Sequence, residues 1–281
     1  MDKSELHRFI DSAITEDIGD GDHTSLSCIP KDARGSAKLL VKGDGVIAGV
    51  ELAKEIFAKL DPTAKLDIKI KDGEKIEVGQ IAFTVEANIQ KLLLAERLVL
   101  NCMQRMSGIA TETKKYVDKI RAYNSKVLDT RKTTPNCRII EKWAVRIGGG
   151  TNHRYGLYDM IMIKDNHVDY AGGISQAIDR ANKYLNDTGR KLKIEIETRN
   201  LDEVEEALNT GGIDRIMLDN FMPSTMSDAL KLINKKIETE ASGGITLETI
   251  ADYAATGVDF ISVGALTHSF ESIDLSLKAI D

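Results

Sequence analysis

The chain has 281 residues, of which 42% are hydrophobic and 29% are charged, as is typical of a soluble globular protein that buries a core. Its formal net charge of −6 argues against a nucleic-acid or membrane-surface protein, for which an excess of Lys and Arg is expected. No run of residues approaches the roughly 18 apolar positions that span a bilayer, and the charged, amphipathic N-terminus is unlike a signal peptide. The cysteines Cys28, Cys102 and Cys137 are odd in number and lack metal-ligand spacing, so we expect a reduced, cytoplasmic protein.

The first part of the chain predicts a mixed α and β unit. Residues 34–50 and 64–86 have the period-two alternation and glycine-containing turns of short strands. Residues 50–60 between them, and the long run 88–122 after them, have the apolar spacing of helices. Gly108 lies near the expected end of this unit.

From Lys126 onward, short apolar strands alternate with helical segments. The strands are expected at residues 127–129, 160–164, 192–197, 215–219, 237–240 and 260–264, with 149–153 as a candidate seventh. Helices are expected at 175–185, 201–209, 224–233 and 247–256. This alternation predicts a parallel sheet covered by helices, either closed as a barrel or left open.

The predicted strands of this second part all end in polar or glycine residues. In chain order these ends are Asp129 with Thr130, Arg131 and Lys132; Lys164; Glu197; Asp219; Ser242 with Gly243 and Gly244; and Gly264 with Ala265. Because the carboxyl ends of barrel strands face one mouth, we expect these side chains to converge there.

Positive charge is concentrated between Asp129 and His167, where seven Lys or Arg stand against four acids. This segment carries +3 on an acidic chain, which suits a small anionic ligand better than a long polyanion. One such cation would ordinarily form a surface salt bridge, but five are expected on the same rim, namely Arg131, Lys132, His153, Arg154 and Lys164. By contrast, Arg138, Lys142 and Arg146 at four-residue spacing are predicted to form the solvated face of a helix.

Two glycine turns and two carboxylates complete the expected rim. Ser242-Gly-Gly244 and Val263-Gly-Ala265 each end a strand before a helix; alone each is most often a simple turn, but as a pair they predict a phosphate site. Glu197 and Asp219 suit ribose hydroxyls, Mg²⁺ or a developing oxocarbenium charge, and they could equally balance the cations of the rim. Glu195, two residues before Glu197, is expected deeper in the barrel beside a cation.

The ordered motifs of the chain closely match those of one family. They are Glu16-Asp-Ile-Gly-Asp-Gly-Asp-His-Thr-Ser25, Ala95-Glu-Arg97, Asn101, Ser107-Gly-Ile-Ala-Thr111, Asp129-Thr-Arg-Lys-Thr-Thr-Pro135, Gly148-Gly-Gly-Thr-Asn-His-Arg154, Ile163-Lys-Asp-Asn-His167, Glu195-Ile-Glu197, Leu218-Asp-Asn-Phe221, Glu240-Ala-Ser-Gly-Gly-Ile245 and Val263-Gly-Ala-Leu-Thr-His268. Over nearly its whole length the chain resembles the quinolinate phosphoribosyltransferases, which belong to the type II phosphoribosyltransferases. One departure, an extra residue at Gly211-Gly212, falls in a loop and affects no expected ligand.

The resemblance implies an α/β fold with an N-terminal α/β sandwich domain, residues 1–110, and a seven-stranded (β/α) barrel, residues 111–268. The tail 269–281 would return to the first domain. It also implies the reaction of quinolinate with phosphoribosyl pyrophosphate and Mg²⁺, which gives nicotinate mononucleotide, pyrophosphate and CO₂ in NAD biosynthesis. The molecule would be a homodimer, with assembly beyond the dimer left open, in which Arg97 reaches the partner's site.

The resemblance further implies roles for the residues of the rim. Arg97, Arg131, His153, Arg154 and Lys164 would hold the quinolinate, and Lys132 with Lys164 would lie near the pyrophosphate. Glu197 and Asp219 would hold the ribose hydroxyls and the metal. The substrate-binding set is completed by Thr130, Ser242, Gly243, Gly244, Val263, Gly264 and Ala265, and the catalytic set is Lys132, Lys164, Glu197 and Asp219.

Three alternatives stand beside this interpretation. A molybdenum-transport-associated relative would use the same fold on another ring, but the cations Arg97, Arg131, His153 and Arg154 together favour a dicarboxylate. A biotinyl or lipoyl carrier is suggested by the turns of residues 71–79, which lack that family's modifiable lysine. A metal-dependent barrel hydrolase would need a pair of histidines at metal spacing, which His153 and His167 do not provide.

Overall fold

The computed structural model describes residues 3–280, which form two compact units. The first unit comprises the chain up to Lys114, Thr133–Gly149 and the chain from Leu266 onward, and the second comprises Lys115–Lys132 and Gly150–Ala265. The expected domain limits of 1–110 and 111–268 stay a prediction. No helix among residues 3–280 is long and apolar enough to cross a membrane.

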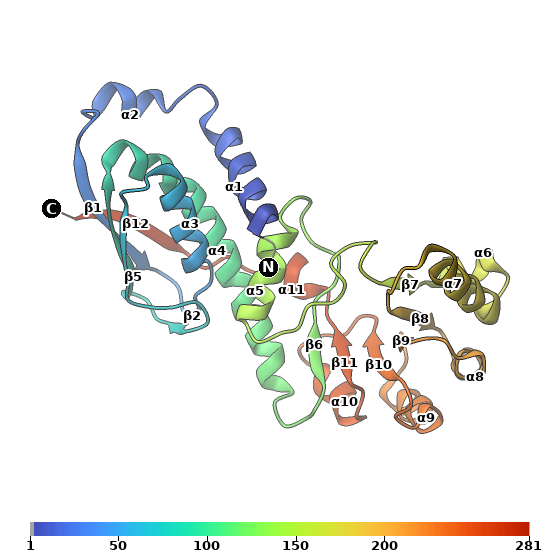
Figure 1. Ribbon diagram of the computed structural model, residues 1–281. Coiled ribbons are helices and arrows are strands. Elements are labelled where there is room, and N and C mark those ends of the chain that lie inside the picture. The colour runs from blue at the N-terminus through green and yellow to red at the C-terminus, as the bar shows by residue number, and fades with distance from the viewer. Residues whose placement is uncertain (1–2, 281) are drawn as a thin grey trace. The chain divides into compact units, whose positions relative to one another are not determined.

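The first unit is built on a four-stranded antiparallel sheet with the order β12-β1-β5-β3. Its strands are β1 (Arg34–Val41), β3 (Lys65–Ile68), β5 (Ile81–Asn88) and β12 (Leu275–Ile280), and β2 (Gly45–Val46) pairs separately with β4 (Lys75–Ile76). Its helices are α1 (Lys3–Ile18), α2 (His23–Cys28), α3 (Val50–Leu60), α4 (Ile89–Lys119), which runs on into the second unit, α5 (Arg138–Ile147) and α11 (Ala265–His268). In Figure 1 the C-terminal strand β12, in red, lies beside β1, in blue, with which it pairs along its length.

The core of this unit follows from the alternation seen in the sequence. Leu39 and Val41 of β1 are fully buried, and Phe83 of β5 meets Phe57 of α3 edge to face, with ring centroids 6.2 Å apart. Helix α3 begins where the Asp72 carboxylate accepts the backbone N–H of Val50 at 2.8 Å, which satisfies a donor that the first turn of a helix leaves open. The turn that suggested a carrier domain therefore has a structural function, because Asp72 caps a helix.

Helix α5 corrects the expectation of a solvated cationic face. Lys142 is only 2% exposed, and Arg138 is half-buried with its Nε donating to Thr133 Oγ1 at 3.0 Å, whereas Arg146 is exposed. Four-residue charge spacing identifies one side of a helix, but it does not reveal what packs against that side. The prediction was wrong for Lys142 because α5 is covered there.

Arg105 of α4 and Glu141 of α5 hold the loop that leads into α5. The Arg105 guanidinium donates to Glu141 Oε1 at 2.9 and 2.6 Å and to Thr134 Oγ1 at 2.5 Å, and the backbone N–H of Thr134 donates to Glu141. Glu141 has no exposed area, so its charge depends on this partner. Arg105 also lies 4.8 Å over the ring of Phe270, which joins the C-terminal segment to α4.

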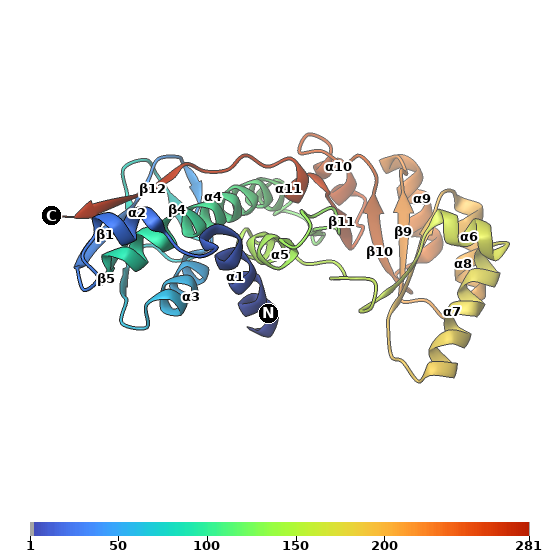
Figure 2. The same ribbon diagram turned by 90° about the horizontal axis from the view of Figure 1, so that it is seen from above.

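The second unit is a parallel sheet with the order β6-β11-β10-β9-β8-β7. Its strands are β6 (Lys126–Leu128), β7 (Ile161–Ile163), β8 (Ile194–Thr198), β9 (Arg215–Asp219), β10 (Glu238–Ser242) and β11 (Phe260–Ser262). Its helices are α6 (Asp165–Ala171), α7 (Ile174–Thr188), α8 (Leu201–Thr210), α9 (Pro223–Ile233) and α10 (Ile250–Ala255). Helices α7, α8 and α9 pack side by side along the outside of the sheet (Figure 2), so β8 and β9 are buried almost throughout.

The expected α/β class is confirmed, with one qualification about the seventh strand. Residues 149–153 add to the sheet through a single parallel bridge between Thr151 and Leu128. The Thr151 amide donates to Val127 O at 2.8 Å, and the Asp129 amide donates to Thr151 O at 3.1 Å. Thr151 therefore extends the sheet beyond β6, and the residues that follow it leave from the same edge as the other strand ends.

Replacement of Gly108 tests the docking of the C-terminal segment on α4. A Cβ at this position would lie 2.2 Å from the carbonyl oxygen of Glu271. We expect Gly108→Ala to lower the free energy of unfolding by about 1–3 kcal/mol, as overpacking does. Urea unfolding of the variant measures this value. Helix propensity alone predicts a gain of about 1 kcal/mol, so a more stable variant would contradict the close approach.

Candidate active site

The carboxyl-terminal edge of the parallel sheet gathers the residues that the sequence analysis placed on a rim. Neighbouring parallel strands end at the same edge, so the segments that follow them lie next to one another. In order across the sheet, these are His153 and Arg154 after Thr151; Thr130, Arg131 and Lys132 after β6; Val263, Gly264 and Ala265 after β11; Ser242, Gly243 and Gly244 at the end of β10; Asp219 on β9; Glu197 on β8; and Lys164 after β7. Arg97 belongs to the first unit, where it is exposed on α4.

Arg131 and Arg154 each follow by three residues a partner of the parallel bridge between Leu128 and Thr151. Arg131 is exposed and Arg154 is half-buried, with its Nη1 donating to Met160 O at 3.2 Å. Burial, and after it the positive charge of Arg131, hold the pKa of Arg154 below its ordinary value. Two like charges at close range repel each other, so an anion with two carboxylates that contacts both would be bound with a gain in electrostatic energy.

Lys164 and Glu197 form the ion pair at the ends of β7 and β8. Lys164 Nζ lies 3.0 Å from Glu197 Oε2, and the lysine side chain is 46% exposed while the carboxylate side chain is only 8% exposed. The backbone N–H of Lys164 donates to His167 Nδ1 at 2.9 Å, which fixes the strand end at the start of α6. The lysine thus presents a charge to solvent while its carboxylate partner anchors it.

The end of β9 is joined to the end of β10 through Asn220. The backbone N–H of Asn220 donates to Ser242 O at 2.9 Å, and its side-chain amide donates to Asp219 Oδ2 at 2.5 Å. Its φ is 57°, a backbone conformation that Asn tolerates better than most residues. Gly243 has a φ of 100°, and a Cβ there would lie 2.2 Å from Asn220 Oδ1. Sequence reasoning assigned Asn220 no role, although an Asp-Asn pair directly after a strand is a turn signal.

Glu197 and Asp219 are the carboxylates expected to hold the metal ion. They end neighbouring strands, and Asp219 is half-buried at the edge of the sheet. Mg²⁺ is usually bound by one or two carboxylates together with substrate phosphates. Glu197 already pairs with the Lys164 ammonium, so a metal ion shared with Asp219 would have the substrate phosphates as its other ligands.

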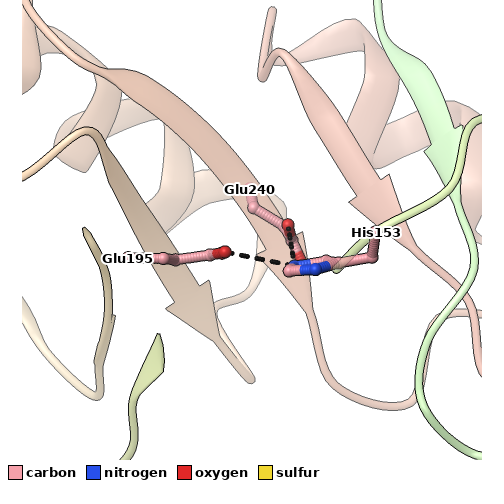
Figure 3. Close-up of side chains that lie close together, drawn as sticks. All are labelled: His153, Glu195 and Glu240. Atoms are coloured by element: carbon pink, nitrogen blue, oxygen red, sulfur yellow. Dashed lines mark ion pairs between the residues drawn. The ribbon is translucent and has the colours of Figure 1, made fainter. Parts of the chain in front are cut away.

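Beneath this rim lies a buried cluster of His153, Glu195, Glu240 and Arg215 (Figure 3 shows the first three). His153 Nε2 lies 3.1 Å from Glu195 Oε2 and 3.1 Å from Glu240 Oε2, and neither glutamate has exposed area. Arg215 Nη1 lies 3.1 Å from the same oxygen of Glu240 and 3.9 Å from Glu195. The expectation that Glu195 lies deep beside a cation is confirmed, whereas Arg215 and Glu240 had been given no role.

The cluster retains a proton near neutral pH. Burial and the charge of Glu240 raise the pKa of Glu195 to about 7. Burial acts to lower the pKa of His153, but the two glutamates outweigh it and raise that pKa to about 9. His153 Nδ1 accepts the backbone N–H of Arg154 at 2.6 Å, which requires a free lone pair. Nε2 therefore carries a ring proton between the two glutamates, and the raised pKa values of His153 and Glu195 indicate that one further proton is shared within the cluster.

The same three ligand groups are compact enough for a metal ion, since their ligand atoms lie within 4.8 Å of one another. Arg215 argues against that role, because its guanidinium already supplies positive charge at Glu240. A metal cation at this point would face a guanidinium in a buried environment. We therefore interpret the cluster as an ion-pair network.

Comparison with known proteins gives one family over nearly the whole chain. A family model described as "Quinolinate phosphoribosyl transferase, N-terminal domain" matches residues 22–107, and its C-terminal counterpart matches residues 109–278. "Quinolinate phosphoribosyltransferase [decarboxylating] 1b" of Nicotiana tabacum is 46% identical, over 98% of this chain and 82% of that protein. "Probable nicotinate-nucleotide pyrophosphorylase [carboxylating]" of Bacillus subtilis is 42% identical, over 99% of this chain and 94% of that protein.

The fold agrees with the sequence match. The crystal structure of NadC from Streptococcus pyogenes has a TM-score of 0.92 and 35% identity, over 100% of this chain and 99% of that one. The match therefore covers both compact units, together with the strand ends on which the candidate site is built. On these grounds the chain belongs to the quinolinate phosphoribosyl transferase family.

Proposed function

We propose that the protein transfers the phosphoribosyl group of phosphoribosyl pyrophosphate to quinolinate with decarboxylation, as a step of NAD biosynthesis. The products are nicotinate mononucleotide, pyrophosphate and CO₂. The observation that carries the proposal is that Arg131 and Arg154 follow two bridged segments at the sheet edge that also bears the glycine turn of Ser242 and Gly243. A dicarboxylate and a phosphate ester are the two anions that this edge suits.

Quinolinate carries two adjacent carboxylates, which Arg131 and Arg154 would bind side by side. Guanidinium groups form paired hydrogen bonds with carboxylates and remain charged at any physiological pH. Lys164 contributes a third positive charge, with Glu197 as its anchor. The expected quinolinate ligands also include His153, and Arg97 from a second subunit.

The phosphoribosyl donor would occupy the rest of the edge. The backbone of Ser242, Gly243, Gly244 and the segment Val263–Ala265 offers N–H groups to the 5′-phosphate. Glu197 and Asp219 would accept hydrogen bonds from the ribose hydroxyls and hold Mg²⁺. When bound, Mg²⁺ would neutralise charge on the departing pyrophosphate, beside Lys132 and Lys164.

The chemistry needs positioning and charge rather than a nucleophilic side chain. The pyridine nitrogen forms a bond to C1 of the ribose, and pyrophosphate leaves with the electron pair of the broken C–O bond. The ring nitrogen becomes positive, so it stabilises the electron pair that remains at C2 when the carboxylate leaves as CO₂, and C2 then takes up a proton. Holding the two substrates in register supplies much of the rate gain in such reactions.

Incubation with quinolinate, phosphoribosyl pyrophosphate and Mg²⁺ tests the proposed reaction. We expect nicotinate mononucleotide and CO₂ in equal amounts, because each transfer releases one carboxylate. Chromatography of the nucleotide and trapping of labelled CO₂ measure both products. Product from nicotinate, with none from quinolinate, would contradict the decarboxylating activity.

Replacement of the two arginines tests the dicarboxylate site. We expect Arg131→Ala and Arg154→Ala each to raise KM for quinolinate by about 10- to 100-fold, since a charged hydrogen bond contributes about 1.5–3 kcal/mol. KM for phosphoribosyl pyrophosphate should change much less. The control is Arg180→Ala, which removes an exposed guanidinium from α7 of the same unit. Equal effects of all three changes on the quinolinate KM would count against the assignment.

We further propose a homodimer in which Arg97 of one subunit completes the site of the other, in keeping with its exposed position on α4. Assembly beyond the dimer is left open.

The cysteines Cys28, Cys102 and Cys137 are free, which supports a reducing, cytoplasmic compartment.

Mixing inactive subunits tests the shared site. Arg97→Ala and Lys132→Ala proteins should each be nearly inactive alone. After random reassortment, half of the dimers are mixed and each has one intact site, so activity should return to about a quarter of the wild-type value. Steady-state assays after mild dissociation and remixing measure the recovery. Absence of recovery, with mixed dimers present by native mass spectrometry, would exclude a site built from two subunits.

A further inference from the structure

His153 is placed so that both ring nitrogens face protein groups. Its side chain is only 5% exposed, Nε2 points between Glu195 and Glu240 (Figure 3), and Nδ1 receives the Arg154 amide at 2.6 Å. A ring held in this way has little capacity left for hydrogen bonds to a carboxylate of the substrate. Because Nδ1 accepts a hydrogen bond from the Arg154 amide, the ring can instead fix the backbone of Arg154.

The backbone from Asn152 to Arg154 is held at three points within the second unit. Asp129, which is fully buried, accepts the His153 amide at 2.8 Å and the Asn152 side chain at 2.5 Å. The third point is the His153 ring, through its bond to the Arg154 amide. Two of these bonds fix the peptide groups on either side of the His153 Cα, so they set the direction in which the Arg154 side chain leaves the backbone.

The orientation of the His153 ring is in turn set by the two glutamates and Arg215. Arg215 Nη1 lies 3.1 Å from Glu240, and its Nη2 lies 3.1 Å from Glu238. The side chain of Glu240 has no exposed area and contacts both Arg215 and His153, whereas that of Glu238 is 40% exposed and is paired with Arg215 and Lys193. The contacts therefore form a chain from Arg215 through Glu240 and His153 to the amide of Arg154.

We propose that Glu240, with Glu195 and Arg215, acts as a positioning residue for the dicarboxylate: it fixes the His153 ring, which in turn fixes Arg154 against the substrate. The inference rests on the proposed function, because it takes Arg154 as a quinolinate ligand. It changes the role of His153 from direct ligand to the link between a buried ion pair and the ligand arginine. Glu240 can hold the ring in one orientation because the same carboxylate oxygen lies 3.1 Å from both His153 and Arg215.

Glu240→Gln tests this chain of contacts, with Glu238→Gln as the matched control. Both changes remove a carboxylate 3.1 Å from Arg215, but only the first removes a partner of His153. We expect Glu240→Gln to raise KM for quinolinate by about tenfold, with kcat and KM for phosphoribosyl pyrophosphate within about twofold, as the loss of binding energy common to the ground state and the transition state does. Glu238→Gln should leave all three parameters near wild type.

Glu240→Asp provides a second route if Glu240→Gln folds poorly. It keeps the negative charge in the cluster but withdraws the carboxylate by one methylene from both His153 and Arg215, so the quinolinate KM should again rise alone. Folding of each variant is checked by circular dichroism and thermal unfolding. An unchanged quinolinate KM in the folded Glu240 variants, or an equal rise in Glu238→Gln, would overturn the inference.

Different results would refute the proposed function and the positioning role of Glu240. A wild-type protein without activity on quinolinate would refute the proposed function before any variant is compared. An active wild type whose Glu240 variants behave like the Glu238 control would refute the positioning role alone.

Discussion

Two carboxylates without exposed area lie side by side inside the parallel sheet, and much of the candidate site depends on how their charge is balanced. Glu195 and Glu240 both lie 3.1 Å from one histidine nitrogen. Buried like charges are tolerated only with opposite charge and hydrogen bonds close by. Arg215 from the neighbouring strand supplies the charge, and a retained proton reduces the repulsion, as the raised pKa of Glu195 indicates. The ring of His153 is thereby fixed, together with the backbone that presents Arg154.

The opposite part of the same edge is organised by the backbone rather than by charge. Asn220 turns the chain at the end of β9 with a positive φ, and its amide bonds to Ser242 at the end of β10. Gly243 approaches Asn220 so closely that any Cβ would collide with it. One strand end thus determines the shape of the next. A backbone turn of this kind binds a phosphate through N–H groups, which need no side chain but do need a fixed geometry.

Much of the fold could be predicted from the sequence because its patterns are local. The helix at residues 50–60 and the strand at 215–219 were expected with the bounds that the structure has, since the first has the apolar spacing of a helix and the second is a short apolar segment. The strand ends also predicted which residues share the edge of the sheet, because parallel topology requires it. The burial of Lys142 could not be predicted, because it depends on what packs against α5, and periodicity contains no such information.

The contacts of the buried cluster were equally beyond local patterns. Arg215 is 20 residues from Glu195 and 25 residues from Glu240 along the chain, and the three residues lie on neighbouring strands. A single charged residue at the start of an apolar strand was nevertheless a signal, because an isolated buried cation is unstable and implies buried acids nearby.

Burial, more than the number of charges, separates the cations proposed to bind a ligand from those that maintain the fold. Arg131 and Lys132 are exposed at the strand ends, whereas Lys142 and Arg215 are buried, and the structure gives Arg215 the carboxylate partners Glu238 and Glu240. A buried cation that already has carboxylate partners would have to give them up to bind a substrate, at a cost comparable to the gain. An exposed cation gives up mainly water. Arg154 is intermediate between the exposed and the buried cations, because it is half-buried. Its backbone N–H is held by His153, and the charge of Arg131 lowers the pKa of its guanidinium. In the proposed site, its affinity for a carboxylate would therefore depend on the buried residues beneath it.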